Sequence, residues 1–181
     1  MWYVIQVFSG KENEVCELIK HHAGDAVTDE GKRILKECFV PRYQVERKFH
    51  GRYKTLTRNL FPGYVIAVTS YIEKLNQILY KVPLFTKVLG SDQVFIPLER
   101  TEMAFINSFT TEKHRVIRMS KAVKEGDRIR VVEGPMVGCE GWITEINRRK
   151  GTARIETNAF GRTLNITIGL SVVNSLSSES E

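Results

Sequence analysis

The sequence predicts an α+β protein with an N-terminal αβ sandwich and a small C-terminal five-stranded β-barrel. Two observations carry this prediction. Residues 1 to about 109 mix helical and strand periodicities, whereas residues from 125 onward show only strand and turn patterns. We therefore place a first domain at 1–109, a basic linker at 110–122 and a second domain at 123–181.

The first domain opens with a strand and a helix. An apolar strand is expected at residues 2–8, and Ser9-Gly10 then leads into a helix whose apolar residues recur at helical spacing. The polar stretch 23–31 is expected to be a loop. A second strand is predicted over 34–40, ended by Pro41.

Residues 42–58 are predicted to form a basic hairpin with its tip at His50-Gly51. Six Lys and Arg side chains face Glu46 as the one acidic residue of this segment. Charged hairpin edges often serve only to prevent aggregation, so this role and contact with nucleic acid both stay open.

The rest of the first domain is predicted to complete an antiparallel sheet flanked by helices. A buried strand at 65–68 follows Phe61-Pro62-Gly63-Tyr64, and helices are expected at 71–81 and 99–109. Short strands are expected at 88–89 and 94–96. An aromatic residue beside a strand usually packs in the core, which is the default interpretation of Phe61 and Tyr64.

The second domain is predicted to be a closed barrel of short strands punctuated by glycines. Side chains fill the interior of a barrel this small, so we expect function on its loops and outer face rather than in a deep pocket. Trp142 and Phe160 are its aromatic residues, and Trp142 is expected in the core because it lies in a predicted strand.

The net charge of +6 is concentrated in the segment between the domains. Residues 1–110 carry 15 Lys and Arg against 12 Asp and Glu, and residues 125–181 carry seven against eight. Residues 111–124 carry five basic side chains against Glu112 alone. This pattern is typical of a polyanion-binding segment, and a plain solvated linker is the alternative.

Several function classes have no support in the sequence. There is no apolar leader and no run of 18 apolar residues, so we expect a cytoplasmic protein without membrane contact. Cys16, Cys38 and Cys139 lack a CxxC pair and are expected to be reduced packing cysteines. His21-His22 is not a metal pair by its spacing. We find no catalytic, metal or cofactor motif and predict that the protein is not an enzyme.

The chain resembles the NusG family of transcription elongation factors nearly end to end. Family segments occur in family order and spacing: Trp2-Tyr3-Val4-Ile5-Gln6 with Ser9-Gly10, Phe61-Pro62-Gly63-Tyr64, Val82-Pro83 before Val88-Leu89-Gly90, Gly126-Asp127 with Gly134-Pro135, and Phe160-Gly161-Arg162. The resemblance implies that the second domain is an SH3-like KOW barrel and that no catalysis is involved.

The resemblance also implies contacts. The first domain would bind the clamp helices of RNA polymerase as a monomer and favour processive elongation. Its apolar contact surface would include Phe8, Phe61, Pro62 and Tyr64, which implies that Phe61 and Tyr64 are partly exposed. The basic hairpin would lie near upstream DNA, through Arg47, Lys48, Arg52 and Lys54.

The chain departs from the housekeeping family pattern after Arg162. A Thr-Pro-Val-Glu-Leu type segment follows there in housekeeping members, in which this loop binds a ribosomal protein or Rho, whereas this chain reads Thr163-Leu164-Asn165-Ile166-Thr167-Ile168. The departure and the basic connector resemble the LoaP subfamily, whose members are associated with a structured leader RNA and suppress termination. A housekeeping elongation factor and a ribosome-associated KOW protein are the alternatives.

The cations of the connector and of the Arg148-Arg149-Lys150 turn predict an RNA-binding rim on the barrel. The rim would grip the phosphates of a nascent RNA hairpin, because side chains cannot read the narrow major groove of duplex RNA. The candidate RNA-binding residues are Lys113, Arg115, Arg118, Lys121, Lys124, Arg128, Arg148, Arg149, Lys150 and Arg162.

Overall fold

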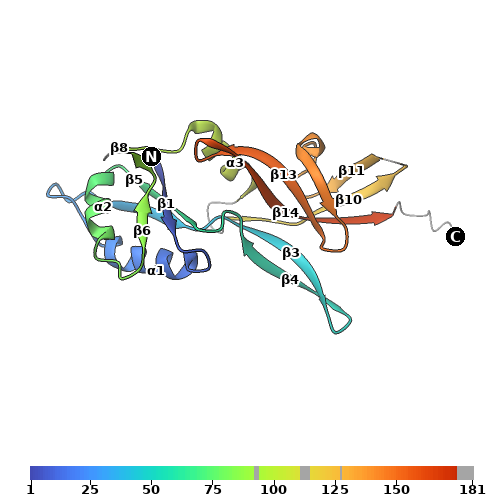
Figure 1. Cartoon of the computed structure of the whole chain (residues 1–181), viewed down its shortest axis with the longest axis horizontal. Coiled ribbons are helices and arrows are strands. Elements are labelled where there is room, and N and C mark those ends of the chain that lie inside the picture. Colours follow the sequence, from blue (N-terminus) through green and yellow to red (C-terminus); the bar gives the residue numbers. More distant parts are fainter. Residues whose placement is uncertain (92–93, 111–114, 127, 175–181) are drawn as a thin grey trace. The chain divides into compact units, whose positions relative to one another are not determined.

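The computed structural model describes residues 1–91, 94–110, 115–126 and 128–174. The chain forms two compact units (Figure 1). The first unit contains residues 1–41 and 61–105, and the second contains residues 42–60 and 106–181. The predicted hairpin thus groups with the C-terminal residues, although it interrupts the first unit in the sequence. The domain limits expected from the sequence stay a prediction.

The first unit is built on a four-stranded antiparallel sheet with the order β2-β5-β1-β6. Its strands are β1 (Trp2–Val7), β2 (Leu35–Phe39), β5 (Tyr64–Thr69) and β6 (Thr86–Val88). Helices α1 (Glu12–Ala23) and α2 (Ile72–Leu79) lie beside it (Figure 1). Their apolar faces pack on alternate residues of the central strands, such as Ile5 and Val65, which are fully buried. The strands and helices predicted in this part of the sequence are confirmed.

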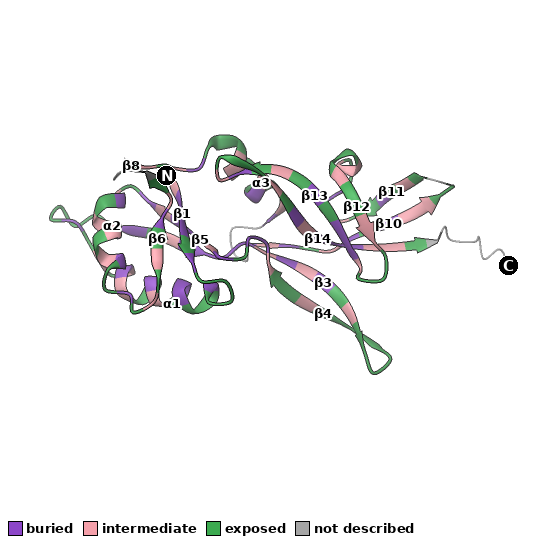
Figure 2. Cartoon of the chain, viewed as in Figure 1, coloured by how far each residue is buried: buried purple, intermediate pink, exposed green. Residues whose placement is uncertain are grey.

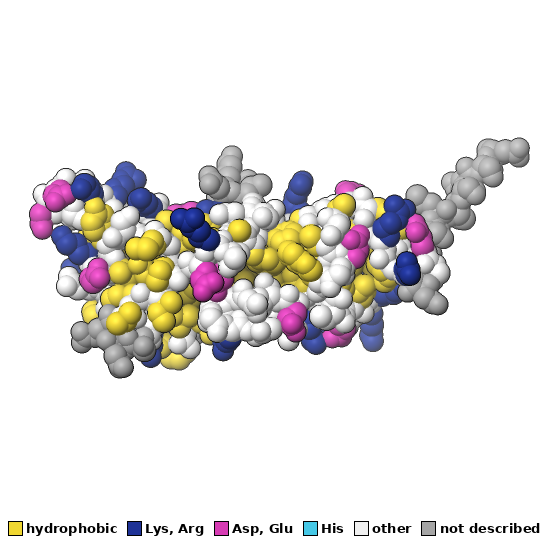
Figure 3. Space-filling model, turned by 90° about the horizontal axis from the view of Figure 1, so that it is seen from above, with side chains coloured by type: hydrophobic (Ala, Val, Ile, Leu, Met, Phe, Trp, Pro, Cys, Tyr) yellow, Lys and Arg dark blue, Asp and Glu magenta, His cyan; other side chains and the backbone are white. Residues whose placement is uncertain are grey.

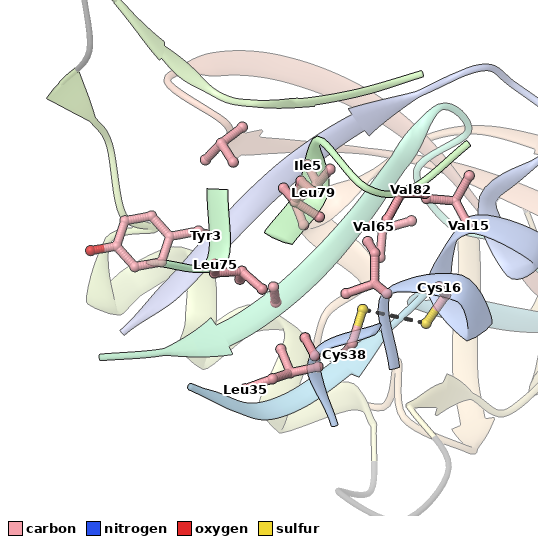
Figure 4. Close-up of a cluster of buried hydrophobic side chains, with 14 of the residues drawn as sticks. Tyr3, Ile5, Val15, Cys16, Leu35, Cys38, Val65, Leu75, Leu79 and Val82 are labelled. Carbon is pink, nitrogen blue, oxygen red and sulfur yellow. Dashed lines mark hydrogen bonds between the residues drawn. The ribbon is translucent and has the colours of Figure 1, made fainter. Parts of the chain in front are cut away.

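Cys16 of α1 and Cys38 of β2 meet in this core (Figure 4). Their sulfur atoms are 3.5 Å apart, and both residues are buried free thiols. The hydrogen bond with Cys16 and burial together raise the pKa of the Cys38 thiol. The two cysteines are buried free thiols that pack in the core, as the sequence predicts.

Three further elements follow the main sheet along the chain. β7 (Gly90–Ser91) and β8 (Val94–Phe95) form a separate two-stranded ladder, so the predicted strand at 94–96 does not extend the main sheet. Helix α3 (Arg100–Phe109) comes next, close to its predicted limits. None of the helices described in the structure is both long and apolar enough to cross a membrane.

The second unit contains a five-stranded sheet with the order β11-β10-β14-β13-β12, curled into a half-barrel. The strands are β10 (Ser120–Glu125), β11 (Arg128–Glu133), β12 (Ile143–Asn147), β13 (Thr152–Ala159) and β14 (Arg162–Asn174). The pair β10 and β14 is parallel and the other pairs are antiparallel. The α+β fold class is confirmed, but the curled sheet is open: no ladder joins β11 to β12 in the described part of the chain.

A short 3₁₀ helix, η1 (Glu140–Trp142), directly precedes β12 in the chain and contacts β11 and β13. The Glu140 carboxylate accepts a hydrogen bond of 2.9 Å from the Val131 amide of β11. The prediction that Trp142 lies in the core is wrong, since its side chain is 46% exposed and contacts the edge of Phe109 at 5.8 Å between ring centroids. The turn, rather than a strand, sets the direction of this side chain, so strand alternation does not apply to it.

The basic hairpin is formed by β3 (Arg42–Phe49) and β4 (Arg52–Asn59), as predicted. Both tip residues have positive φ, 46° at His50 and 83° at Gly51, which matches the turn that tight hairpins favour. β3 also pairs in parallel with β9 (Val116–Ile117). Figure 2 shows buried residues at the base of the hairpin and exposed residues toward its tip.

Candidate protein-binding patch and nucleic-acid interface

Two exposed aromatic side chains lie side by side on the first unit. Phe8 follows β1 and is 63% exposed, and Phe85 precedes β6 and is 43% exposed. Val7 pairs with Thr86, so the ladder itself brings Phe8 and Phe85 together, with ring centroids 5.1 Å apart. Because contiguous exposed apolar surface often serves in binding, this aromatic pair is a candidate contact site for another molecule. Phe85 is not predictable from the sequence pattern, because its contact with Phe8 follows only from the register of β1 and β6.

The other predicted members of the apolar surface differ in exposure. Pro62 is exposed and Tyr64 is half-buried, which agrees with the expectation for Tyr64. Phe61 is only 4% exposed, so the expectation that it is partly exposed is wrong. Its carbonyl accepts the Tyr64 amide within a tight turn, and its ring follows the default for an aromatic residue beside a strand, which is burial.

A buried carboxylate holds the loops that carry Phe8 and Pro62. Glu12, in the first turn of α1, is 2% exposed and accepts hydrogen bonds from the amides of Gly63 at 2.6 Å and Gly10 at 2.9 Å. The Gly63 carbonyl accepts the Val7 amide at 2.9 Å. A negative charge at a helix N-terminus is favourable, which helps explain why this carboxylate is tolerated inside. Glu12 is absent from the residues predicted from the sequence, and the available signal was an acidic residue shortly after Ser9-Gly10.

The predicted nucleic-acid contacts of the hairpin lie along its outer half. Lys48, Arg52 and Lys54 are exposed, whereas Arg47 is half-buried. The Lys48 ammonium lies 5.9 Å from the centroid of the Tyr53 ring, which is itself 71% exposed. The hairpin therefore offers both cations and an aromatic face to solvent.

The predicted RNA-binding residues fall into four groups. Most are exposed: Arg118, Lys121, Arg128, Arg148, Arg149, Lys150 and Arg162. Lys124 is half-buried, and Lys113 lies outside the described residues. Arg115 is 6% exposed and donates to the Asn107 side chain at 2.8 Å, so the expectation that it lies on an exposed rim is wrong. A buried guanidinium needs such a hydrogen-bond partner.

The strand register places part of the rim at one end of the half-barrel. Ser120, at the start of β10, pairs with Leu170, and Gly169 pairs with Thr152, just after the 148–150 turn. Two strand spacings, about 10 Å, thus separate the start of β10 from this turn. Arg162, at the other end of the ladder, is seven residues or about 23 Å from Gly169. Arg118 and the turn can act together, whereas Arg162 cannot join them.

An ion pair modifies the charge of this surface, and a hollow modifies its shape. Lys121 forms an ion pair with Glu133 at 2.8 Å, and the hydrogen bond that its ammonium donates to this carboxylate raises the pKa of Lys121. Arg118 lines a hollow of about 890 Å³ together with Arg42, Phe109 and Pro135. Figure 3 shows hydrophobic side chains gathered in patches on one face, with Lys and Arg side chains around its edges. Cations beside aromatic groups are typical of nucleic-acid surfaces.

These surfaces and the fold define a two-unit binding protein, an αβ unit followed by a curled KOW-like half-barrel. Within the described ranges, no group of three or more His, Cys, Asp or Glu residues could hold a metal ion. A family profile described as "Transcription termination factor nusG" matches residues 1–107. The chain belongs to the NusG family of transcription termination and antitermination proteins, whose members are not enzymes.

Individual relatives match over most of their length. The transcription termination/antitermination protein NusG of Pasteurella multocida is 28% identical over 178 residues, 95% of this chain and 93% of the relative. That of Lactococcus lactis is 30% identical over 171 residues, 89% and 85% of the two chains. A solved structure, "Domain interaction in Thermotoga maritima NusG", is 21% identical with a TM-score of 0.50 and covers 93% of this chain and 92% of that one, which supports the fold.

Proposed function

We propose that the protein is a LoaP-like antitermination factor that acts in the cytoplasm as a monomer. Its first unit binds the clamp helices of RNA polymerase. Its half-barrel and the adjoining basic segment bind a structured nascent leader RNA, and the complex reads through terminators. The observation that carries the proposal is the presence of two unlike surfaces, an exposed aromatic patch on the first unit and exposed cations on the second.

The aromatic patch supports the polymerase contact. Phe8 and Phe85 are large rings already packed against each other, and Pro62 and the half-buried Tyr64 lie in the adjoining turn and strand. Rigid rings bury much area at little cost in conformational entropy, which is why they dominate binding to partner helices. Glu12 fixes the turns beside these rings, so binding costs little additional conformational entropy of the backbone.

The half-barrel supports the RNA contact. Arg148, Arg149 and Lys150 are all exposed in one turn between β12 and β13. Arginine forks give directional hydrogen bonds to phosphate oxygens, and the shape of an RNA hairpin then supplies specificity. The outer hairpin cations Lys48, Arg52 and Lys54 are available for upstream DNA.

One observation favours the alternative, a housekeeping NusG whose KOW unit couples to a ribosomal protein or Rho. The Phe160-Gly161 turn stands at the tip of β13 and β14 with positive φ at both residues, 59° and 70°. Such a turn presents a loop to a protein partner. The residues after Arg162, which lack the proline and acidic residue of the housekeeping pattern, favour the RNA-binding proposal instead.

The RNA arm of the proposal is tested by changing Arg148, Arg149 and Lys150 to Ala. Hairpin RNA binding should weaken, and the slope of log affinity against log salt should flatten by about 0.7–0.9 per lost phosphate contact. A matched control changes three exposed lysines of the first unit, Lys32, Lys36 and Lys81, to Ala. Equal affinities and slopes in both variants would contradict the RNA arm, and capture of a ribosomal protein or Rho with no RNA selectivity would support the alternative.

The polymerase arm is tested with Phe8→Ala. Association with purified RNA polymerase should be lost, because the ring that packs on Phe85 is removed, while RNA affinity should be unchanged. Tyr80→Ala is the control, since Tyr80 is an 84% exposed aromatic residue of the same unit. Comigration of the Phe8→Ala variant with polymerase would show that the docking surface lies elsewhere.

A further inference from the structure

A cleft in the second unit lies between the basic hairpin and the half-barrel. Its volume is about 270 Å³. The hairpin supplies Tyr43, Arg47 and Arg58, and the half-barrel supplies Lys150 and Arg154 among others. From the sequence, Arg47 was assigned to DNA and Lys150 to RNA as two separate contacts. The structure places both side chains in one cleft.

The lining is strongly cationic. Arg47, Arg58, Lys150 and Arg154 face a single carboxylate, Glu145, which pairs with Arg154 at 2.8 Å. Within the described residues, no ion pair involves Arg47, Arg58 or Lys150. Three like charges gathered in a cleft repel one another and favour a bound anion.

Neutral donors complete the lining. Burial raises the pKa of Tyr43, while the nearby Arg58 and Arg47 act in the opposite direction. Thr152 and Thr167 add hydroxyl groups. The volume is slightly below the usual range for pockets that hold drug-sized molecules, about 300–1,000 Å³. A phosphate with its sugar fits this space, whereas a base pair does not.

We propose that the cleft holds a backbone phosphate of a single RNA strand between Arg47, Arg58 and Lys150. Arg47 and Arg58 then belong to the RNA-binding site of the half-barrel, while the outer hairpin cations Lys48, Arg52 and Lys54 stay available for DNA. The inference rests on the proposed RNA-binding function and assigns it a location. It also adds Arg58, which the sequence analysis did not select.

One glycine keeps the two walls of the cleft together. Gly169 of β14 lies directly against β3, and a Cβ atom added there would overlap the carbonyl oxygen of Gln44. A Cβ added at Gly151 would lie 3.7 Å from the carbonyl oxygen of Glu46, in ordinary contact. Gly169 is not among the glycines with positive φ, so a larger residue is compatible with the β14 backbone itself. Gly169→Val therefore separates the walls without changing any charge.

The test measures binding of the full chain to a fluorescently labelled 12-nucleotide single-stranded RNA. Changing Arg47, Arg58 and Lys150 to Gln should weaken binding roughly tenfold or more, because charge-assisted hydrogen bonds are lost. The control changes Lys32, Lys36 and Lys81 to Gln and removes the same charge from the first unit. Gly169→Val should reproduce the loss, and Gly169→Ala serves as a milder variant if Val lowers the melting temperature.

A double-mutant cycle examines whether the two walls share one phosphate. The effects of Arg47→Gln and Lys150→Gln should be non-additive, because either loss disrupts the same contact. Additive effects, or wild-type affinity in both Gly169 variants, would overturn the composite site. A loss confined to a DNA strand of the same length would make the cleft a DNA site and also overturn it. Absence of binding by the unaltered chain to both this strand and a hairpin RNA would instead refute the proposed function, whereas hairpin binding without strand binding would overturn only the cleft site.

Discussion

Single residues decide how the apolar patch of the first unit is supported. Glu12 is nearly inaccessible and satisfies two backbone amides from loops that are far apart in the sequence. The sequence identifies the Phe61-Pro62-Gly63-Tyr64 segment but not which of its rings reaches solvent. Burial in a turn depends on contacts made after folding, and periodicity does not report them. For that reason the residue pattern does not reveal Phe85, and it favours burial of Phe61, whose exposure only the family resemblance implies.

The support from Glu12 is measurable. Glu12→Ala should lower the free energy of unfolding by about 2 kcal/mol, because the buried Gly63 amide and the partly buried bond from Gly10 both lose their carboxylate acceptor. Glu14→Ala is the control, since Glu14 makes an exposed ion pair with Lys11 and should contribute less than about 1 kcal/mol. Urea denaturation measures both values. Similar losses for the two variants would show that Glu12 does not hold the loops.

At the scale of elements, the alternation of apolar residues predicts most strands well. The strands of the half-barrel and the tip of the basic hairpin follow from this pattern and from glycine placement. The pairing of β3 with β9 could not be predicted in this way, because the paired residues lie about 70 positions apart in the sequence. Such pairings depend on tertiary packing, which local propensity does not encode.

The open edge of the half-barrel has a pH-sensitive support. Hydrogen bonds from its own amide and from the Val131 amide lower the pKa of Glu140 from the ordinary value of 4.5. Since the folded pKa is depressed, the contribution to stability is present above the unfolded value and is lost as the pH falls through the folded one. The Val131 amide resonance should therefore titrate with a midpoint below 4.5. Glu140→Gln should abolish this titration, and a midpoint at or above the ordinary value would contradict the assignment.

At the scale of the whole molecule, the proposed function joins two contacts on one chain. Once one unit is bound, the second contact becomes intramolecular, so the effective concentration rises without any new interaction. The sequence predicts the two kinds of surface. It does not predict that residues 42–60 belong with the second unit, because a hairpin carries no signal in its own sequence for the sheet or barrel against which it packs.

The two contacts should therefore fail in different ways. The triple change Arg47→Gln, Arg58→Gln and Lys150→Gln removes the RNA contact. It should raise the protein concentration needed for half-maximal terminator read-through, while the maximal read-through is still reached at high concentration. Phe8→Ala should lower the maximal read-through, because the variant then does not bind polymerase at any practical protein concentration. Read-through measured across a protein titration separates the two behaviours. Identical curves for the two variants would show that the contacts are not linked in this way.

The position of the hairpin within the chain also bears on how the protein is made. Residues 42–60 leave the ribosome before β9 and β14, against which β3 packs. At about 5–20 residues per second, β3 waits several seconds for the first of these partners. During that interval β3 can pair only with β4. The two segments of the first unit, 1–41 and 61–105, have by then both been synthesised and can pack together. We expect the cationic outer half of the hairpin to disfavour pairing of this unpaired strand edge with other nascent chains.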